Sequence, residues 1–269
     1  MKIKINGKET ETDGASLYRI KSAFCPTVQN PVVILNGFQT AEDLPVQEGD
    51  EVVLIEKGKM PGKDVLEAMI SARHTPHVYE KVKQAHVAVA GLGGLGSNIA
   101  VALARTGVGH LHLVDFDVVE PSNLNRQQYG IRHLGMLKTE ALRSELAEIN
   151  PYINITVDTV LITADNAAEL FAGDEIVCEA FDKPEAKAML VNTLLEKCPR
   201  KKIVSGSGMA GYESSNSIVT KRHMKNLYMC GDGETKAMVG RGLMAPRVLT
   251  CAGHQANMIL RLILGIEEV

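Results

Sequence analysis

The sequence contains no tryptophan and few aromatic residues, which together make up 4% of the chain. That share is too small for the stacked aromatic platforms on which single-stranded nucleic acids are bound. The formal net charge is −3, so the chain also lacks the excess of Lys and Arg that neutralises a nucleic-acid backbone. We therefore expect no nucleic-acid partner.

Long apolar runs are absent as well. No segment approaches the roughly 18 to 20 consecutive apolar residues of a membrane helix. The N-terminal stretch MKIKINGKE alternates apolar and polar residues and has no apolar core of the length found in signal peptides. The sequence thus predicts a cytoplasmic protein with no membrane partner.

Cysteine is scarce and scattered. The five cysteines, Cys25, Cys178, Cys198, Cys230 and Cys251, are 20 or more positions apart, and no Cys-x-x-Cys motif occurs. Disulfides are not expected in such a chain, and a four-thiolate zinc site is argued against because its ligands normally come in closely spaced pairs.

The remaining composition is that of a globular protein, with 45% hydrophobic and 23% charged residues. A length of 269 residues suggests one large domain or one and a half. The pattern divides the chain at the glycine-bearing segment 58–62. We expect a small domain over residues 1–58 and a larger one over residues 59–269.

The small domain reads as strand, strand, helix, strand, strand. Turn signals stand at Asn6-Gly7 and Asn36-Gly37, where two-residue hairpin loops favour this pair. Ser16 precedes a short amphipathic pattern that Pro26 ends. This order in fewer than 60 residues indicates a β-grasp, ubiquitin-like fold. The expected elements are strands at 3–5, 9–12, 32–35 and 51–55 and a helix at 17–24.

The large domain alternates strands with helices after a helical pattern at 64–82. The residues at 86–90 form an apolar run ended by glycines, and an amphipathic helix to residue 106 and a strand at 111–115 follow. Strand, glycine turn, helix and strand make one unit of a parallel sheet. We predict an α/β fold with a doubly wound, mostly parallel Rossmann-like sheet. Further strands are expected at 153–160, 176–179 and 203–205, with helices at about 134–149, 183–197 and 247–264.

A glycine-rich turn lies between the first strand and helix of this domain. Gly91, Gly93, Gly94 and Gly96 stand in a Gly-x-Gly-x-x-Gly pattern, which lets backbone N–H groups approach phosphates at a helix N-terminus. Asp115 follows about 20 residues later at a strand end, where a carboxylate accepts hydrogen bonds from ribose hydroxyls. The pattern predicts an adenine-nucleotide site but does not separate NAD from ATP.

The residues after Asp115 favour ATP. Asp117, Asn123, Arg126 and Lys138 add an acid, an amide and two cations beside the nucleotide. Hydride transfer builds little charge on phosphates, whereas cations suit a reaction that builds negative charge on a triphosphate. Either cation alone would be interpreted as a solvated surface charge, but their shared position beside the ribose acid points to ATP.

The motifs carry a family resemblance. The glycine turn, the string Ser-Asn-Leu-Asn-Arg-Gln at 122–127 and the Leu-Gly-x-x-Lys run ending at Lys138 resemble the ThiF/MoeB family, bacterial relatives of ubiquitin-activating enzymes. The resemblance extends over about residues 64–266. It implies a homodimeric adenylyltransferase that uses ATP and Mg²⁺ to adenylate the C-terminal glycine of a small sulfur-carrier protein.

The resemblance also implies roles for matching residues. Asp115 would hold the ribose, and Asn123, Arg126 and Lys138 would contact the phosphates. Asp182, at the end of a predicted strand, would hold Mg²⁺, although taken alone it would equally suit a cap of the helix at 183–197. Arg73 would reach the ATP of the partner subunit.

Two departures from the family pattern stand out. The region where many relatives carry paired Cys-x-x-Cys motifs for zinc offers only Cys230 here, in what the sequence suggests is a glycine-bearing loop; this argues against zinc and leaves Cys230 as a candidate for a covalent link to the carrier. The second departure is the N-terminal domain, which resembles the sulfur carrier ThiS but continues through residues 58–62 without a free Gly-Gly end. A substrate mimic and a purely stabilising domain are equally compatible with it.

The ThiS-like pattern points to thiamine biosynthesis. Three alternatives remain open: adenylation of another carrier such as the molybdopterin type, an NAD-dependent oxidoreductase, and a non-catalytic carrier-binding protein.

Overall fold

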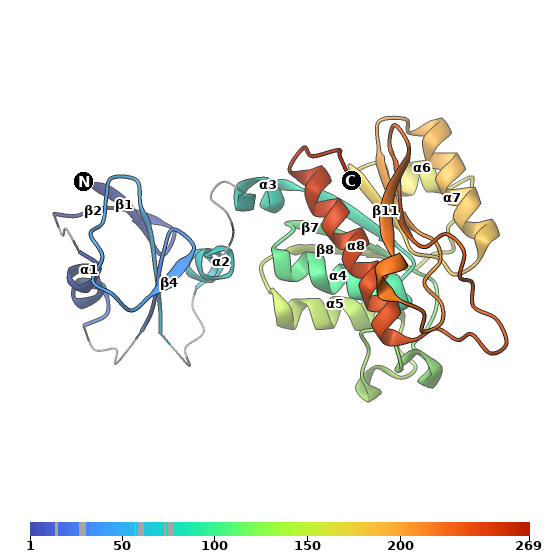
Figure 1. Ribbon diagram of the computed structural model, residues 1–269, viewed down its shortest axis with the longest axis horizontal. Coiled ribbons are helices and arrows are strands. Elements are labelled where there is room, and N and C mark those ends of the chain that lie inside the picture. The colour runs from blue at the N-terminus through green and yellow to red at the C-terminus, as the bar shows by residue number, and fades with distance from the viewer. Residues whose placement is uncertain (14–15, 27–30, 57, 59–61, 73, 75–77) are drawn as a thin grey trace. The chain divides into compact units, whose positions relative to one another are not determined.

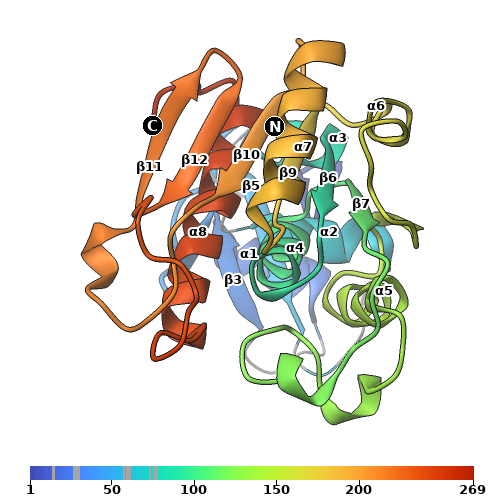
Figure 2. The ribbon, with the colours of Figure 1, turned by 90° about the vertical axis from the view of Figure 1, so that its right-hand side faces the viewer.

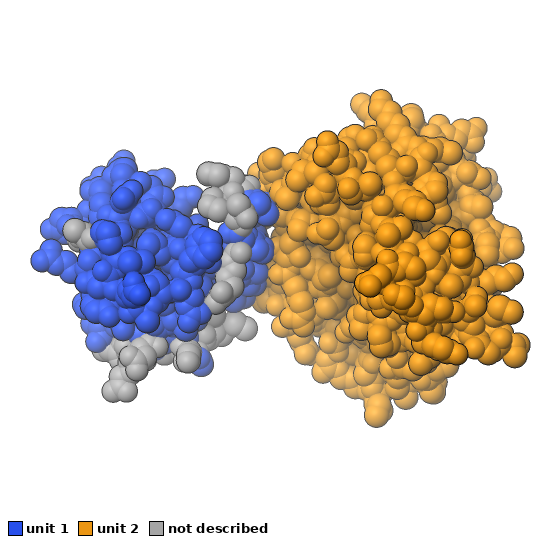
Figure 3. Space-filling view, in the orientation of Figure 1, with its two compact units in different colours: residues 1–80 blue, residues 81–269 orange. Residues whose placement is uncertain are grey.

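The computed structural model describes residues 1–13, 16–26, 31–56, 58, 62–72, 74 and 78–269. These residues belong to two compact units, Met1–Glu80 and Lys81–Val269 (Figures 1 and 3). Each unit has its own sheet and its own apolar core. In the part of the chain that is described, no helix is both apolar and long enough to cross a bilayer.

The N-terminal unit is a mixed five-stranded sheet with the order β2-β1-β5-β3-β4, in which β1 and β5 run parallel. Ile3 and Ile5 of β1 pack with Leu17 and Ile20 of α1 in its core. Its elements are β1 (Lys2–Ile5), β2 (Lys8–Glu11), α1 (Leu17–Phe24), β3 (Val32–Leu35), β4 (Phe38–Thr40), β5 (Glu51–Ile55) and α2 (Lys63–Ser71).

Both predicted hairpin turns are present, and both have the same backbone conformation. Asn6 and Gly7 have φ of 47° and 78°, and Asn36 and Gly37 have φ of 50° and 86°. A positive φ at both central residues is the requirement of the type I′ turn, which Asn-Gly meets at low cost. The second turn leads into β4, a three-residue strand that the sequence pattern did not reveal.

The helix α2 covers the face of this sheet opposite to α1. In β5, Val52 and Leu54 join the core under α1, whereas Val53 joins a smaller core with Ile34 and Ala72. This split follows from the alternation of side chains along a strand. The compact N-terminal unit thus reaches Glu80, whereas the sequence placed the boundary after residue 58.

The C-terminal unit contains a seven-stranded sheet of order β11-β12-β10-β9-β6-β7-β8. All neighbouring strands are parallel except β11 and β12. Its elements, with the connecting α3, are α3 (Val78–Gln84), β6 (His86–Ala90), α4 (Gly94–Thr106), β7 (His110–Val114), α5 (Lys138–Ile149), β8 (Asn154–Asp158), α6 (Ala167–Leu170), β9 (Ile176–Glu179), α7 (Pro184–Lys197), β10 (Lys202–Gly206), β11 (Val219–Met224), β12 (Leu227–Gly231) and α8 (Ala245–Ile263).

Helices cover both faces of this sheet, as Figure 2 shows: α4, α5 and α8 pack on one face, and α6 and α7 pack on the other. Central strands such as β6 are therefore buried on both sides, which explains their continuous apolar sequence. The predicted doubly wound, mostly parallel sheet is confirmed.

Two local predictions differ from the structure. The hairpin of β11 and β12 was missed, because its connection, Lys225-Asn226, carries no glycine signal and most of β11 is exposed and polar. The helix predicted from about residue 134 begins at Lys138, because a 3₁₀ turn, Ile131–His133, occupies the preceding chain.

Candidate functional site

A cavity of about 770 Å³ opens at the carboxyl ends of the central strands of the C-terminal unit. It lies where the strand order changes direction, with β7 and β8 to one side of β6 and with β9, β10 and β12 to the other. Ligands of open α/β sheets bind at such a switch point. The predicted site residues that line this cavity are Gly91, Gly93, Gly94, Asp115, Asp117, Asn123, Arg126, Lys138 and Asp182.

The glycines of the turn serve different purposes. Gly91 has φ of 88°, and a Cβ there would meet the Phe181 ring at 2.9 Å. A Cβ at Gly96 would lie 1.8 Å from the Gly91 carbonyl oxygen, so this glycine allows α4 to pack on the turn and does not line the cavity. A Cβ at Gly93 would have one neighbour within 4 Å, Gln127 at 3.9 Å, which leaves backbone open to a ligand.

Asp115 joins the turn to the end of β7. Its carboxylate accepts hydrogen bonds from the backbone N–H groups of Leu92 at 2.7 Å and Asp117 at 2.8 Å. The side chain is nearly buried, yet it lines the cavity. Each carboxylate oxygen has a second lone pair, so Asp115 can also accept a hydrogen bond from a ligand hydroxyl.

Lys138 is buried at the N-terminus of α5, with 7% of its surface exposed. Its ammonium lies 3.1 Å from the Asp117 carboxylate, and its backbone N–H donates to the Asp117 carbonyl at 2.9 Å. This pair fixes the cation at the cavity wall. Asp117, which the sequence assigned to the nucleotide, forms an ion pair with Lys138 and is half exposed.

Arg126 lies on the segment that connects β7 to α5. Its guanidinium donates to the Ser122 carbonyl at 3.0 Å and to the Asn125 side chain at 2.8 Å. Its buried Nε and the buried Oε1 of Gln127 have no hydrogen-bond partner among the described residues. A buried donor without a partner is costly, so the cavity suits a ligand with acceptor oxygens here, as a phosphate has.

Asn123 is buried, and its Oδ1 accepts from the Glu120 N–H at 3.0 Å. This contact closes the short 3₁₀ turn, Pro121–Asn123, and leaves the amide N–H₂ for another acceptor. The string at 122–127 therefore does bring its amide and its guanidinium to one cavity wall.

Asp182 is exposed at the cavity, three residues beyond the end of β9. No group of three His, Cys, Asp or Glu side chains that could hold a metal occurs among the residues that the structure describes. A single carboxylate fits Mg²⁺, which commonly takes one or two protein carboxylates together with waters and substrate phosphates. Arg73 lies outside the described residues.

A buried acid three residues before Asp182 was missed by the sequence analysis. Glu179, the last residue of β9, is fully buried, and its carboxylate accepts from Lys187 Nζ and Ser205 Oγ, each at 2.5 Å. It also accepts from the Phe181 N–H at 2.7 Å. This network fixes the start of the segment that carries Asp182.

Cys230 was placed in a loop by the sequence, and this was wrong. It lies inside β12 with 1% of its surface exposed. Burial raises the pKa of its thiol to about 11, although a hydrogen bond with Thr220 partly opposes this. Burial likewise raises the pKa of the Cys251 thiol to about 12. Both sulfurs are therefore thiols at neutral pH, and thiols are poor nucleophiles.

Comparisons with known proteins agree with this arrangement. The ThiF family model matches residues 67–269, and the model described as ThiS-like ubiquitin matches residues 1–58. The molybdopterin-synthase adenylyltransferase of Salmonella typhimurium is 35% identical over 190 residues, which cover 68% of this chain and 75% of that protein.

Two further proteins are similar to parts of this chain. The adenylyltransferase and sulfurtransferase UBA4 of Eremothecium gossypii is 31% identical over 193 residues, and the match covers 69% of this chain but 43% of that longer protein. A crystal structure of the E. coli tRNA N6-threonylcarbamoyladenosine dehydratase TcdA in complex with ATP has a TM-score of 0.68 at 22% identity, covering 77% of this chain and 98% of that one. At that identity the likeness shows a shared fold.

Proposed function

The chain belongs to the ThiF family, and from this we propose that it is an adenylyltransferase that uses ATP to activate the C-terminal carboxylate of a ubiquitin-like sulfur-carrier protein. The proposal rests on one observation: the buried Nε of Arg126, a residue that lines the cavity, has no hydrogen-bond partner among the described residues. The nearby Lys138, by contrast, already forms an ion pair with Asp117. A phosphate oxygen would satisfy the Nε of Arg126. Relatives named as adenylyltransferases support the same activity.

The proposed reaction needs no nucleophile from the enzyme. A terminal carboxylate is ionised at pH 7, and one of its oxygens attacks the α-phosphorus of ATP. The bond between that phosphorus and the bridging oxygen breaks, and pyrophosphate leaves with the electron pair. The enzyme has to position the two substrates and stabilise the charge on the phosphoryl groups, which explains a site built from cations and amides.

We assign the residues as follows in this proposal. Asp115 binds the ribose, and Asn123, Arg126 and Lys138 bind phosphates. The open backbone at Gly93 lets a phosphate approach the N-terminus of α4, where N–H groups favour anions. Mg²⁺, held by Asp182, would neutralise phosphate charge when bound.

We propose a ThiS-like carrier as the substrate, because the N-terminal unit of the same chain is itself ThiS-like, and on the same ground we propose a role in thiamine biosynthesis. The relative named for molybdopterin synthase makes a molybdopterin-type carrier the second candidate. We also propose a homodimer in which Arg73 reaches the ATP of the partner subunit. Sedimentation of the purified chain tests the dimer.

The test of the activity is ATP–pyrophosphate exchange with and without an added carrier that ends in Gly-Gly. We expect exchange that depends on the carrier and is abolished in Arg126→Ala and in Asp182→Ala, because each removes charge complementary to the phosphates or the metal. Matched controls are Arg105→Ala and Asp165→Ala, which change exposed residues away from the cavity and should leave exchange unchanged.

Other outcomes would exclude the proposal. Exchange that persists in both site variants would refute the residue assignment. Absence of exchange, combined with tight binding of NADH in a fluorescence titration, would identify an oxidoreductase. Binding of the carrier without any exchange would identify a non-catalytic carrier-binding protein.

We propose in addition that residues 1–58 act as a mimic of the carrier. The unit shares the carrier's fold class, but its chain continues past residue 58 and offers no terminal carboxylate to activate. A protein of this kind can occupy the docking surface of a carrier without becoming a substrate.

A further inference from the structure

The cavity has a second wall that the site motifs do not account for. Residues that follow β10 and β12 also line it, including Ser207, Gly208, Thr235 and Lys236. This wall lies on the far side of β9 in the strand order. No sequence motif pointed to it, because its members come from segments 27 to 29 residues apart.

Of the four lysines that line the cavity, Lys138 is buried and Lys187 is partly exposed, whereas Lys183 and Lys236 are exposed. Lys138 forms an ion pair with Asp117, and Lys187 forms one with Glu179. Lys236 is exposed at the cavity, and it forms no ion pair with any described residue. Its charge is therefore available to a ligand.

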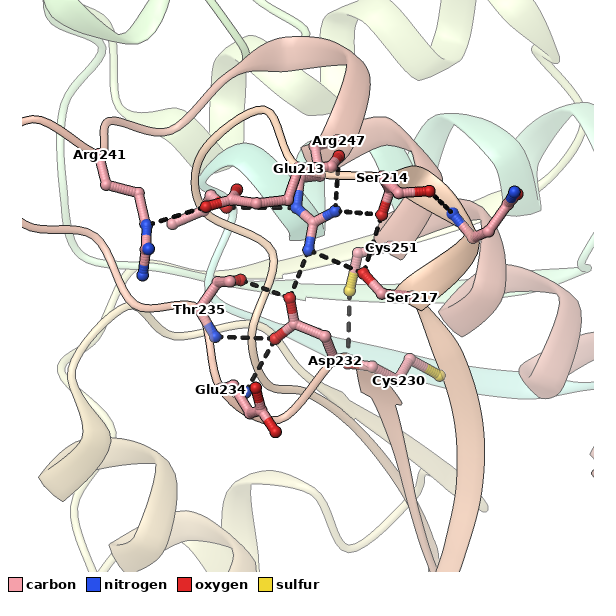
Figure 4. A network of polar contacts seen from close by, with 12 residues as sticks. Glu213, Ser214, Ser217, Cys230, Asp232, Glu234, Thr235, Arg241, Arg247 and Cys251 are labelled. Carbon is pink, nitrogen blue, oxygen red and sulfur yellow. Dashed lines mark hydrogen bonds and ion pairs between the residues drawn. The ribbon is translucent and has the colours of Figure 1, made fainter.

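The segment that carries Lys236 is fixed by a buried arginine at the start of α8. Figure 4 shows the Arg247 guanidinium between the chain after β10 and the chain after β12. Arg247 has 2% of its surface exposed and forms an ion pair with Asp232. Its other acceptors are the carbonyl oxygens of Ala210 at 3.2 Å, Glu213 at 2.9 Å and Ser214 at 2.6 Å and the Ser217 hydroxyl at 3.2 Å.

Asp232 connects Arg247 to Thr235, the residue before Lys236. Its carboxylate accepts from the N–H groups of Glu234 and Thr235, both at 2.8 Å, and from the Thr235 hydroxyl at 2.7 Å. Burial alone would raise the pKa of Asp232, but the hydrogen bonds from Thr235 and Glu234 and the charge of Arg247 lower it. The turn at 232–235, which directly precedes Lys236, is thus fixed by the hydrogen bonds of Asp232 and by its ion pair with Arg247.

The order of the strands places Lys236 relative to a bound nucleotide. Along the carboxyl edge of the sheet, apolar residues after β8 (Val160, Leu161) line one end of the cavity, and the ribose acid Asp115 follows β7. The glycine turn follows β6, where a phosphate meets the N-terminus of α4. Asp182 follows β9. Neighbouring strands are about 4.8 Å apart, so a triphosphate that continues in this direction reaches the wall after β10 and β12.

From this geometry, and resting on the proposed function, we propose that Lys236 binds the terminal phosphoryl groups of ATP. The buried Arg247 and Asp232 act as positioning residues for it. The segment after β12 thereby becomes part of the ATP site. Its lysine adds a positive charge at the leaving pyrophosphate to the charges that Arg126 and Lys138 supply to the phosphates.

The test measures the affinities of ATP and AMP by isothermal titration calorimetry with Mg²⁺ and without any carrier. In Lys236→Met, we expect ATP to bind roughly tenfold more weakly, as for the loss of one hydrogen bond to a charged group. AMP, which lacks the terminal phosphoryl groups, should bind with unchanged affinity. The matched control is Lys221→Met, an exposed lysine of β11 outside the cavity.

Each other result is informative. Equal ATP affinity in Lys236→Met and the unchanged protein overturns the proposal, as does an equal loss for ATP and AMP. Loss of exchange activity with unchanged ATP affinity also overturns it, because Lys236 would then act on the carboxylate substrate. If the unchanged protein binds no ATP at all, the proposed function itself has failed.

The positioning role is tested with Asp232→Asn, which weakens the hold on the 232–235 turn. We expect a smaller fall in ATP affinity and unchanged AMP affinity, a selectivity that general destabilisation would not produce. In the Lys236→Met background, Asp232→Asn should cause no further loss, because the residue through which it acts is gone. Additive losses in this double-mutant cycle would refute the positioning role.

Discussion

At the scale of single residues, the sequence identified side chains that a motif places in order along the chain. Asp115, Arg126 and Lys138 lie within 24 positions of one another, and the fold brings them to one cavity wall. Glu179 could not be found in this way. An acid at the end of an apolar strand reads as the start of a loop, and its partners Lys187 and Ser205 follow at distances that match no local pattern.

Glu179 gives a prediction about stability. Glu179→Gln removes the charge that faces the ammonium of Lys187 and turns one acceptor into a donor or an unmatched group. We expect the free energy of unfolding to fall by about 2 kcal/mol, below the usual cost of breaking a buried ion pair because Lys187 is partly exposed. Urea unfolding measures it.

The matched control for this change is Glu185→Gln on the exposed first turn of α7. A surface substitution of this kind should alter stability by less than about 0.5 kcal/mol. Equal stability of both variants would show that the Glu179 network does not hold the segment before Asp182.

At the scale of elements, the strength of the local signal decided what was predictable. The strands β6 and β9 and their helices were found because parallel strands buried on both faces are continuously apolar. The strand β4 was missed because three residues carry no readable alternation, and β11 was missed because most of its side chains are exposed and polar. These short edge strands depend on pairing with a neighbour, which a single sequence does not display.

One buried histidine links three elements of the large sheet. His112 of β7 lies 2.8 Å from the Asp174 carboxylate before β9 and 2.9 Å from the Asp158 carboxylate at the end of β8. Burial alone would lower the pKa of His112, but the hydrogen bonds and charges of Asp174 and Asp158 outweigh it and raise the pKa above its ordinary value. The folded protein therefore binds this proton more tightly than the unfolded chain.

The sign of the pH dependence follows from that shift. The stabilisation by protonated His112 is fully present below the ordinary histidine pKa of about 6.5 and is lost as the pH rises through the higher folded value. We expect the stability difference between the unchanged protein and His112→Gln to be larger at pH 6 than at pH 9, measured by urea unfolding. His223→Gln, at an exposed site on β11, is the control, and a difference independent of pH would contradict the prediction.

At the scale of the whole molecule, the sequence predicted two folds but could not show where each compact unit ends. The ThiS-like match covers residues 1–58, whereas the compact unit continues to Glu80. The reason is α2, whose residue Met69 packs against the small core of Ile34, Val53 and Ala72. A helical pattern in a sequence does not reveal which sheet the helix covers.

This boundary determines how the proposed carrier mimic should be tested. Removal of residues 1–58 alone would strip α2 of the apolar surface that it covers, so the better truncation begins at Lys81. If the N-terminal unit competes with a carrier for one surface, its removal should lower the KM for a Gly-Gly-ending ThiS-like carrier in pyrophosphate exchange by about tenfold, since a tethered competitor acts at an effective concentration in the millimolar range. Because this truncation also removes Arg73, which we propose reaches the ATP of the partner subunit, the truncated protein is compared with Arg73→Ala in the untruncated chain. The kcat of these two proteins should be the same, because both keep the cavity residues and both lack Arg73. Adding residues 1–80 as a separate protein should raise the KM again.

An unchanged KM on truncation would instead mark the N-terminal unit as a stabilising domain, in which case the truncated protein should show a lower Tm.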